Sequence, residues 1–190
     1  MKVDISFPFA LMLAVVLLFD YSGVAAISLA AAALHEAGHL AAMAACHRQP
    51  RQISFKLSGV YITQNSGAHS AASDCIVAAA GPLANLLCAA ALFAAGAGDA
   101  TIVIGCSMLI MGCFNLLPVY GLDGGDLLHA ALCARLSPTA ADRVLWVVSI
   151  VTAALVTLLG VLLFIVGGNG WLMAIGVYIM CFSLFPRSRV

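Results

Sequence analysis

Three residues capable of metal chemistry stand within five positions of an otherwise apolar stretch: His35, Glu36 and His39 form the pattern HExxH. Residues four apart lie on one face of a helix, so both imidazoles can bind a single metal ion. A zinc ion held in this way lowers the pKa of its bound water to about 7. Glu36 lies beside that position and is suited to act as the general base that takes the proton of the water.

The pattern HExxH alone is common, so the surrounding residues decide whether it indicates a metal site. Ionisable residues inside an apolar helix are costly and usually serve a function. The alternative interpretation is a group of polar side chains that pair with one another to pack helices. Three such residues within five positions favour the metal site.

A catalytic zinc has three protein ligands and one open position. We expect the third ligand to be Asp123, in the segment NLLPVYGLDGG at residues 115–125. Pro118 breaks the preceding helix, and Gly124 and Gly125 permit tight backbone turns next to a ligand. The alternative is that Asp123 is an ordinary turn residue, and the presence of HExxH favours the ligand.

The composition indicates a lipid environment for these residues. The 190 residues are 64% hydrophobic and 8% charged, whereas a soluble domain carries about 25% charged residues. The net charge of zero gives no reason to expect a nucleic-acid partner. The seven cysteines include no CxxC pair, so we expect neither a disulfide framework nor a structural zinc knuckle.

Six apolar stretches approach the length of about 20 residues that a membrane-spanning helix needs. They cover approximately residues 5–19, 23–46, 71–95, 101–117, 143–166 and 170–185. The leucine spacing after Asp123 predicts a further amphipathic helix at the membrane interface, which ends before Pro138. The sequence thus predicts an all-α membrane protein with six transmembrane helices, as a single domain over residues 1–190 with a catalytic core at about 23–125.

The basic residues predict the orientation of this chain in the cell membrane. With six spans, all eight fall at the N-terminus, in the second and fourth loops, and at the C-terminus. Cytoplasmic loops collect Lys and Arg, so both termini are predicted to be cytoplasmic. The histidines and Asp123 then belong to the same cytoplasmic side. The alternative is that the N-terminus is a cleaved signal peptide, since Lys2 precedes an apolar run and small residues follow. The second span begins almost at once, which favours a helical hairpin.

The second loop, residues 47–70, is the only long polar segment. Residues 53–57 alternate apolar and polar side chains, residues 60–63 are β-prone, and Ser58-Gly59 lies between them. This pattern predicts a small membrane-associated β-hairpin between the second and third helices. An irregular surface loop fits the same residues equally well.

The HEAGH segment followed by NLLPxxxLDGG resembles the paired signature of the site-2 proteases, which are intramembrane zinc metalloproteases. Gly81-Pro82-Leu83-Ala84-Asn85 is similar to a further segment of that family, and the resemblance covers about residues 34–125. It implies one Zn²⁺ per chain, held by His35, His39 and Asp123, with Glu36 as the catalytic acid and base. It also implies that Asn115 contacts the substrate or the developing oxyanion, and that Asn85 supports substrate positioning.

In this family a strand is thought to hold the unwound substrate by β-augmentation. The matching region here is Ile53 to Thr63, so the resemblance implies substrate contacts at Ile53, Phe55 and Tyr61. The layout is similar to the six-span stage IV sporulation protease branch, although these residues include no CBS domain and no PDZ domain. Val119-Tyr120-Gly121 departs from the proline-rich family pattern, which is expected to alter the substrate path without removing zinc.

These observations predict an intramembrane zinc endopeptidase that cuts a membrane-anchored or membrane-associated protein near the cytoplasmic face. A transcription-factor precursor or an anti-sigma factor is an example of the expected substrate. The expected partners are the lipid bilayer, the membrane protein substrate and a regulatory membrane protein. Two alternatives are a membrane zinc-binding or transport protein and a zinc-free pseudoprotease that only binds membrane helices.

Overall fold

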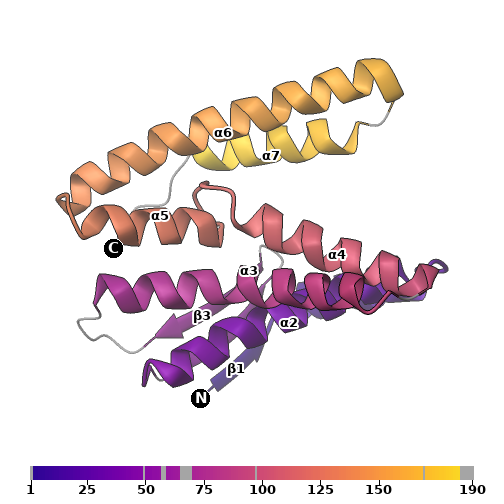
Figure 1. The fold of residues 1–190 in the computed structure, drawn as a ribbon, viewed down its shortest axis with the longest axis horizontal. Coiled ribbons are helices and arrows are strands. Elements are labelled where there is room, and N and C mark those ends of the chain that lie inside the picture. Colours follow the sequence, from indigo (N-terminus) through magenta and orange to yellow (C-terminus); the bar gives the residue numbers. More distant parts are fainter. Residues whose placement is uncertain are drawn as a thin grey trace. The chain divides into compact units, whose positions relative to one another are not determined.

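The computed structural model describes residues 2–48, 50–56, 59–64, 70–96, 98–168 and 170–184. The chain forms two compact units, Met1–Cys113 and Phe114–Val190. The first unit carries helices α1 to α4 and three strands, and the second carries helices α5 to α7 (Figure 1). The described part of the chain is therefore predominantly helical.

The helices of the first unit follow the first four apolar stretches. They are α1 (Phe7–Leu18), α2 (Val24–Ala45), α3 (Ala71–Ala94) and α4 (Asp99–Asn115), which ends just past the boundary of the unit. Helices α2 and α3 pack along each other (Figure 1). The helix boundaries lie within a few residues of those predicted from hydropathy.

Small residues bring the helices of this unit into close backbone contact. A Cβ atom added to Gly38 of α2 would lie 2.7 Å from the carbonyl oxygen of Ala80 on α3. A Cβ added to Gly112 of α4 would lie 3.0 Å from the carbonyl oxygen of Pro82. Glycine at these crossings lets the helices approach at backbone distance, as is common between helices in lipid.

A three-stranded sheet in the order β1-β2-β3 accompanies these helices, with strands Lys2–Ile5, Pro50–Lys56 and Gly59–Gln64. β2 is antiparallel to β3, with Ile53 opposite Ile62, and β1 is parallel to β2. The connection Leu57–Ser58, where the predicted hairpin turns, lies outside the described residues. β1 was not predicted, because four residues carry no measurable period and their partner strand is distant in sequence.

The second unit consists of α5 (Asp123–Cys133), α6 (Pro138–Gly167) and α7 (Trp171–Leu184). Helices α6 and α7 lie side by side (Figure 1). Their close approach depends on glycine at two positions, because a Cβ at Gly160 would lie 2.5 Å from the Cα of Met173, and one at Gly176 would lie 2.7 Å from the Cα of Thr157.

Three of the helices, α2, α3 and α6, are long and apolar enough to cross a membrane, and α1, α4 and α7 are shorter apolar helices. Helix α6 has 30 residues, which at 1.5 Å per residue gives about 45 Å, more than the hydrocarbon core of about 30 Å. It begins at Pro138, where the Ser137 hydroxyl accepts a bond from the Ala140 amide, rather than at Arg143. The prediction began the span at the charged residue Arg143, whereas the helix begins earlier, directly after its N-cap residue Ser137.

Candidate metal centre

The two histidines of the HExxH pattern lie together on one face of α2. Both side chains are buried, with 6% of His35 and 8% of His39 exposed. The Nε2 atoms of the two rings are 3.1 Å apart, as the spacing of four residues allows. Two imidazoles therefore present the same ring nitrogen to one point inside the first unit.

The ring of His39 is oriented by α3. Its Nδ1 atom lies 2.7 Å from the carbonyl oxygen of Val77, and a carbonyl can only accept, so Nδ1 carries the proton. This tautomer leaves the lone pair on Nε2, the atom that faces His35. A histidine that binds a metal usually donates its other ring N–H to a carbonyl or carboxylate in this way.

Gly81 of α3 forms the wall against which both rings lie. A Cβ atom at this position would collide with Nε2 of His39 and would lie 2.8 Å from Nε2 of His35. Real Cβ atoms do not come so close to other heavy atoms, so any side chain larger than hydrogen would displace the imidazoles. The absence of a side chain at Gly81 thus creates the space that the two nitrogens occupy.

This arrangement suits a zinc ion. In a tetrahedral site with Zn–N distances of 2.0–2.1 Å, two ligand nitrogens are separated by about 3.3 Å. The observed separation of 3.1 Å requires only a small adjustment. The fixed tautomer of His39 and the burial of both rings fit the same ion.

Glu36, the predicted base, follows His35 directly on α2 and is half-buried. Successive residues of a helix are rotated by about 100°, so its carboxylate leaves the helix next to the face of the histidines rather than on it. That position is the one a general base needs beside the metal ligands.

Asp123, the predicted third ligand, belongs to the second unit, where it is the first residue of α5 and is half-buried. The first turn of α5 packs directly on the preceding loop. A Cβ at Gly124 would lie 2.6 Å from the carbonyl oxygen of Leu117, and a Cβ at Gly125 would lie 2.7 Å from the carbonyl carbon of Val119. The two glycines therefore let the loop and the first turn of α5 meet as bare backbone.

The two predicted asparagines lie at different depths. Asn115 is the last residue of α4 and is half-buried. Asn85 lies one turn beyond Gly81 on α3 and is 0% exposed. Within the part of the chain that the structure describes, neither the nitrogen nor the oxygen of its carboxamide makes a hydrogen bond. Such a buried amide retains its full capacity to bind a polar group.

The three predicted substrate contacts of the second loop lie in the sheet. Ile53 and Phe55 belong to β2, and Tyr61 belongs to β3, where it is paired with Ser54. The side chains of Ile53, Phe55 and Tyr61 lie outside the described part of the structure.

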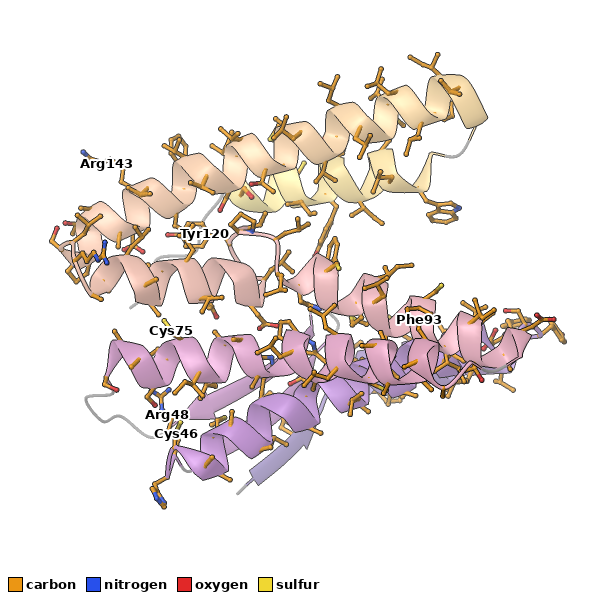
Figure 2. All side chains as sticks on the ribbon, viewed as in Figure 1. Cys46, Arg48, Cys75, Phe93, Tyr120 and Arg143 are labelled. Atoms are coloured by element: carbon orange, nitrogen blue, oxygen red, sulfur yellow. The ribbon has the colours of Figure 1, made fainter. Side chains whose placement is uncertain are left out.

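One partly buried ion pair between α2 and α3 was not predicted from the sequence. Arg48 follows α2 and its guanidinium lies 2.7 Å from the carboxylate of Asp74 in the first turn of α3 (Figure 2). The side chain of Arg48 is 3% exposed and that of Asp74 is 46% exposed. No local pattern links these two residues, because only the folding of α2 against α3 brings them together.

No protein-family model matches the chain. No curated protein matches its sequence either. Among solved structures, the chain is similar to the site-2 protease from Methanocaldococcus jannaschii, with a TM-score of 0.68. This chain shares the fold of that protease. The similarity covers 99% of this chain and 91% of that chain at 18% identity, which is a likeness of fold. Together with the apolar helices, it indicates a membrane protein.

Proposed function

We propose that the chain is an intramembrane zinc endopeptidase of the site-2 type. The observation that carries this proposal is the pair of buried imidazoles on an apolar helix, with Nε2 atoms 3.1 Å apart against the backbone of Gly81. Ionisable side chains at such a position are costly in lipid unless they serve a site. The similarity of the fold to a site-2 protease supports the same conclusion.

The proposed site holds one Zn²⁺ per chain through His35, His39 and Asp123, a set of two imidazoles and one carboxylate that could hold a metal ion. When bound, zinc supplies Lewis acidity and lowers the pKa of a coordinated water. The carboxylate of Glu36 accepts the proton of the attacking water and returns it to the nitrogen of the leaving amine.

The substrate contacts follow from the same proposal. Asn115 donates a hydrogen bond to the oxygen on which negative charge develops, and the buried carboxamide of Asn85 binds a polar group of the substrate or its surroundings. The sheet holds the unwound substrate as an added strand, with contacts at Ile53, Phe55 and Tyr61.

In the proposed topology, six helices span the cell membrane and both termini are cytoplasmic, because this arrangement places every Lys and Arg inside. Cleavage then takes place near the cytoplasmic face. The substrate is a membrane-anchored or membrane-associated protein, such as a transcription-factor precursor or an anti-sigma factor, and access is controlled by a regulatory membrane protein. The proposed layout is similar to that of the stage IV sporulation branch.

The test compares the wild type with Glu36→Gln, each co-expressed with tagged single-span proteins. Glu36→Gln is expected to abolish the cleaved fragment while the purified protein retains its zinc, because the variant keeps both imidazoles. His35→Ala is expected to lose both. A fragment that persists in Glu36→Gln would contradict the protease assignment, and zinc transport that survives in this variant would identify a transport protein instead.

A further inference from the structure

The loop that leads into Asp123, residues 116–122, is held by a helix outside the two motifs. Val119 in this loop is 1% exposed and packs in an apolar cluster with Ala153 of α6 and Ile179 of α7. Its side chain anchors the loop to the α6–α7 pair. The neighbouring residue, Tyr120, adds two hydrogen bonds to α6.

The first of these bonds uses the main chain. The amide N–H of Tyr120 donates to the hydroxyl oxygen of Ser149 at 3.0 Å. Ser149 is 0% exposed, so this bond lies in the interior of the second unit. A main-chain N–H at such a depth needs an acceptor, and Ser149 supplies it from α6.

The second bond uses the phenol. The hydroxyl of Tyr120 donates to Oδ1 of Asp142 at 3.2 Å, and Nε2 of His129 on α5 lies 3.0 Å from the same oxygen. Figure 2 shows Tyr120 beside α5 and α6. The carboxylate of Asp142 therefore joins the loop, α5 and α6 at one point.

The loop and the first turn of α5 meet as backbone, so a displacement of the loop would displace the turn that carries Asp123. The first turn of α5 contacts the loop backbone through Gly124 and Gly125. The intervening Gly121 has φ +84°, a conformation that glycine adopts without strain. A Val-Tyr-Gly sequence has no proline to restrict its backbone, so contacts with α6 must supply the rigidity.

We propose that Tyr120, Ser149 and Asp142 are positioning residues that hold Asp123 in the orientation of a metal ligand. This inference rests on the proposed function. The hydrogen bonds to α6 replace the stiffness that a proline-rich segment would provide, and they make α6 part of the support of the site.

The test measures zinc affinity of the purified full chain by competition with a chelator. Tyr120→Phe, Ser149→Ala and Asp142→Asn are each expected to weaken zinc binding by about 10- to 100-fold, the usual effect of removing a group that orients a ligand. The matched controls are Ser183→Ala and Tyr178→Phe on α7. The hydroxyl of Ser183 is buried like that of Ser149 but donates within its own helix, to the carbonyl of Ile179. Both controls are expected to keep the wild-type affinity.

A second measurement reports on the loop without metal. Ser149→Ala is expected to accelerate amide hydrogen exchange at Tyr120 and in the first turn of α5 by at least about 10-fold, whereas Ser183→Ala leaves these amides unchanged. In an Asp142→Ala background, Tyr120→Phe is expected to cause no further loss of zinc affinity. The carboxylate that accepts the hydrogen bond of the Tyr120 hydroxyl is already missing there.

The two hypotheses fail in different ways. If Asp123→Ala binds zinc as tightly as the wild type, the proposed ligand set is wrong. If Asp123→Ala weakens zinc binding while Tyr120→Phe and Ser149→Ala behave like the α7 controls, the positioning role is overturned and the ligand set stands. Unchanged exchange at Tyr120 in Ser149→Ala also overturns it.

Discussion

Gly81 shows how one residue without a side chain can shape the space around a buried histidine pair. The two imidazoles lie where its Cβ would be, and the carbonyl of Val77, one turn earlier on α3, fixes the tautomer of His39. The histidines come from α2, but their orientation comes from the backbone of α3. The sequence identifies Gly81 only as part of a family-like segment and gives no hint of this contact.

Gly81→Ala is expected to lower zinc affinity by more than about 100-fold and to destabilise the fold by about 1–3 kcal/mol, because the methyl group forces both rings away. Chelator competition and thermal unfolding measure the two effects. The matched control is Gly167→Ala, a helical glycine of α6 with nothing within 4 Å of the added Cβ. Equal zinc affinity in the two variants would show that Gly81 has no role in the site.

At the scale of the elements, α2 and α3 are tied at one end by the ion pair of Arg48 and Asp74. Removing one partner of a fully buried pair costs about 3–5 kcal/mol, since the remaining charge stays in the interior. Solvent screens part of this pair, because Asp74 is 46% exposed. The interaction therefore stabilises the helix pair by less than a fully buried pair would.

Asp74→Asn is expected to reduce the free energy of unfolding by about 1–2 kcal/mol. Asp99→Asn is its matched control, because Asp99 is also an acid in the first turn of a helix, α4, but is exposed. Both variants lose the same favourable interaction with the helix dipole. Equal stability of the two proteins would mean that the ion pair with Arg48 contributes nothing.

The start of α2 depends on pH through Asp20. The amide of Ala26 donates to this carboxylate and, as the largest cause, lowers the pKa of Asp20 below its usual value, with a smaller contribution from the Ser22 hydroxyl. A lowered pKa means that the stabilisation is present above about pH 4 and is lost as the pH falls through the folded-state pKa. The Ala26 amide resonance should therefore shift in acid in the wild type and not in Asp20→Asn. A pH-independent resonance in the wild type would contradict the hydrogen bond from the Ala26 amide to Asp20.

At the scale of the whole molecule, hydropathy predicts which helices span the membrane, and the distribution of charge predicts their orientation. Each of the six apolar stretches contains a helix, and α2, α3 and α6 are long and apolar enough to cross a membrane. The shorter helices need thinning of the bilayer or shielding by neighbours to span it. The orientation remains a prediction from the distribution of Lys and Arg.

Reporter fusions test this orientation. Green fluorescent protein fused after Val190 is expected to fluoresce, since the C-terminus is predicted to be cytoplasmic. Alkaline phosphatase inserted after Gly98, directly before α4, is expected to be active, since the loop between α3 and α4 is predicted to lie outside. Alkaline phosphatase activity at Val190 would contradict the six-span topology. Inactive alkaline phosphatase at Gly98 would place the loop between α3 and α4 in the cytoplasm.

The sequence by itself determined the helices and the shared face of His35 and His39, because hydropathy and a spacing of four residues are local properties of the chain. It also drew attention to Asp123, Asn115 and Asn85, whose roles remain predictions. Only the tertiary structure decided that Gly81 forms the wall of the histidine pair. It also decided which residues distant in sequence are paired: β1 with β2, Arg48 with Asp74, and Tyr120 with Ser149 and Asp142. The physical reason is that these contacts join residues far apart in sequence, and their existence depends on how closely the helix backbones pack.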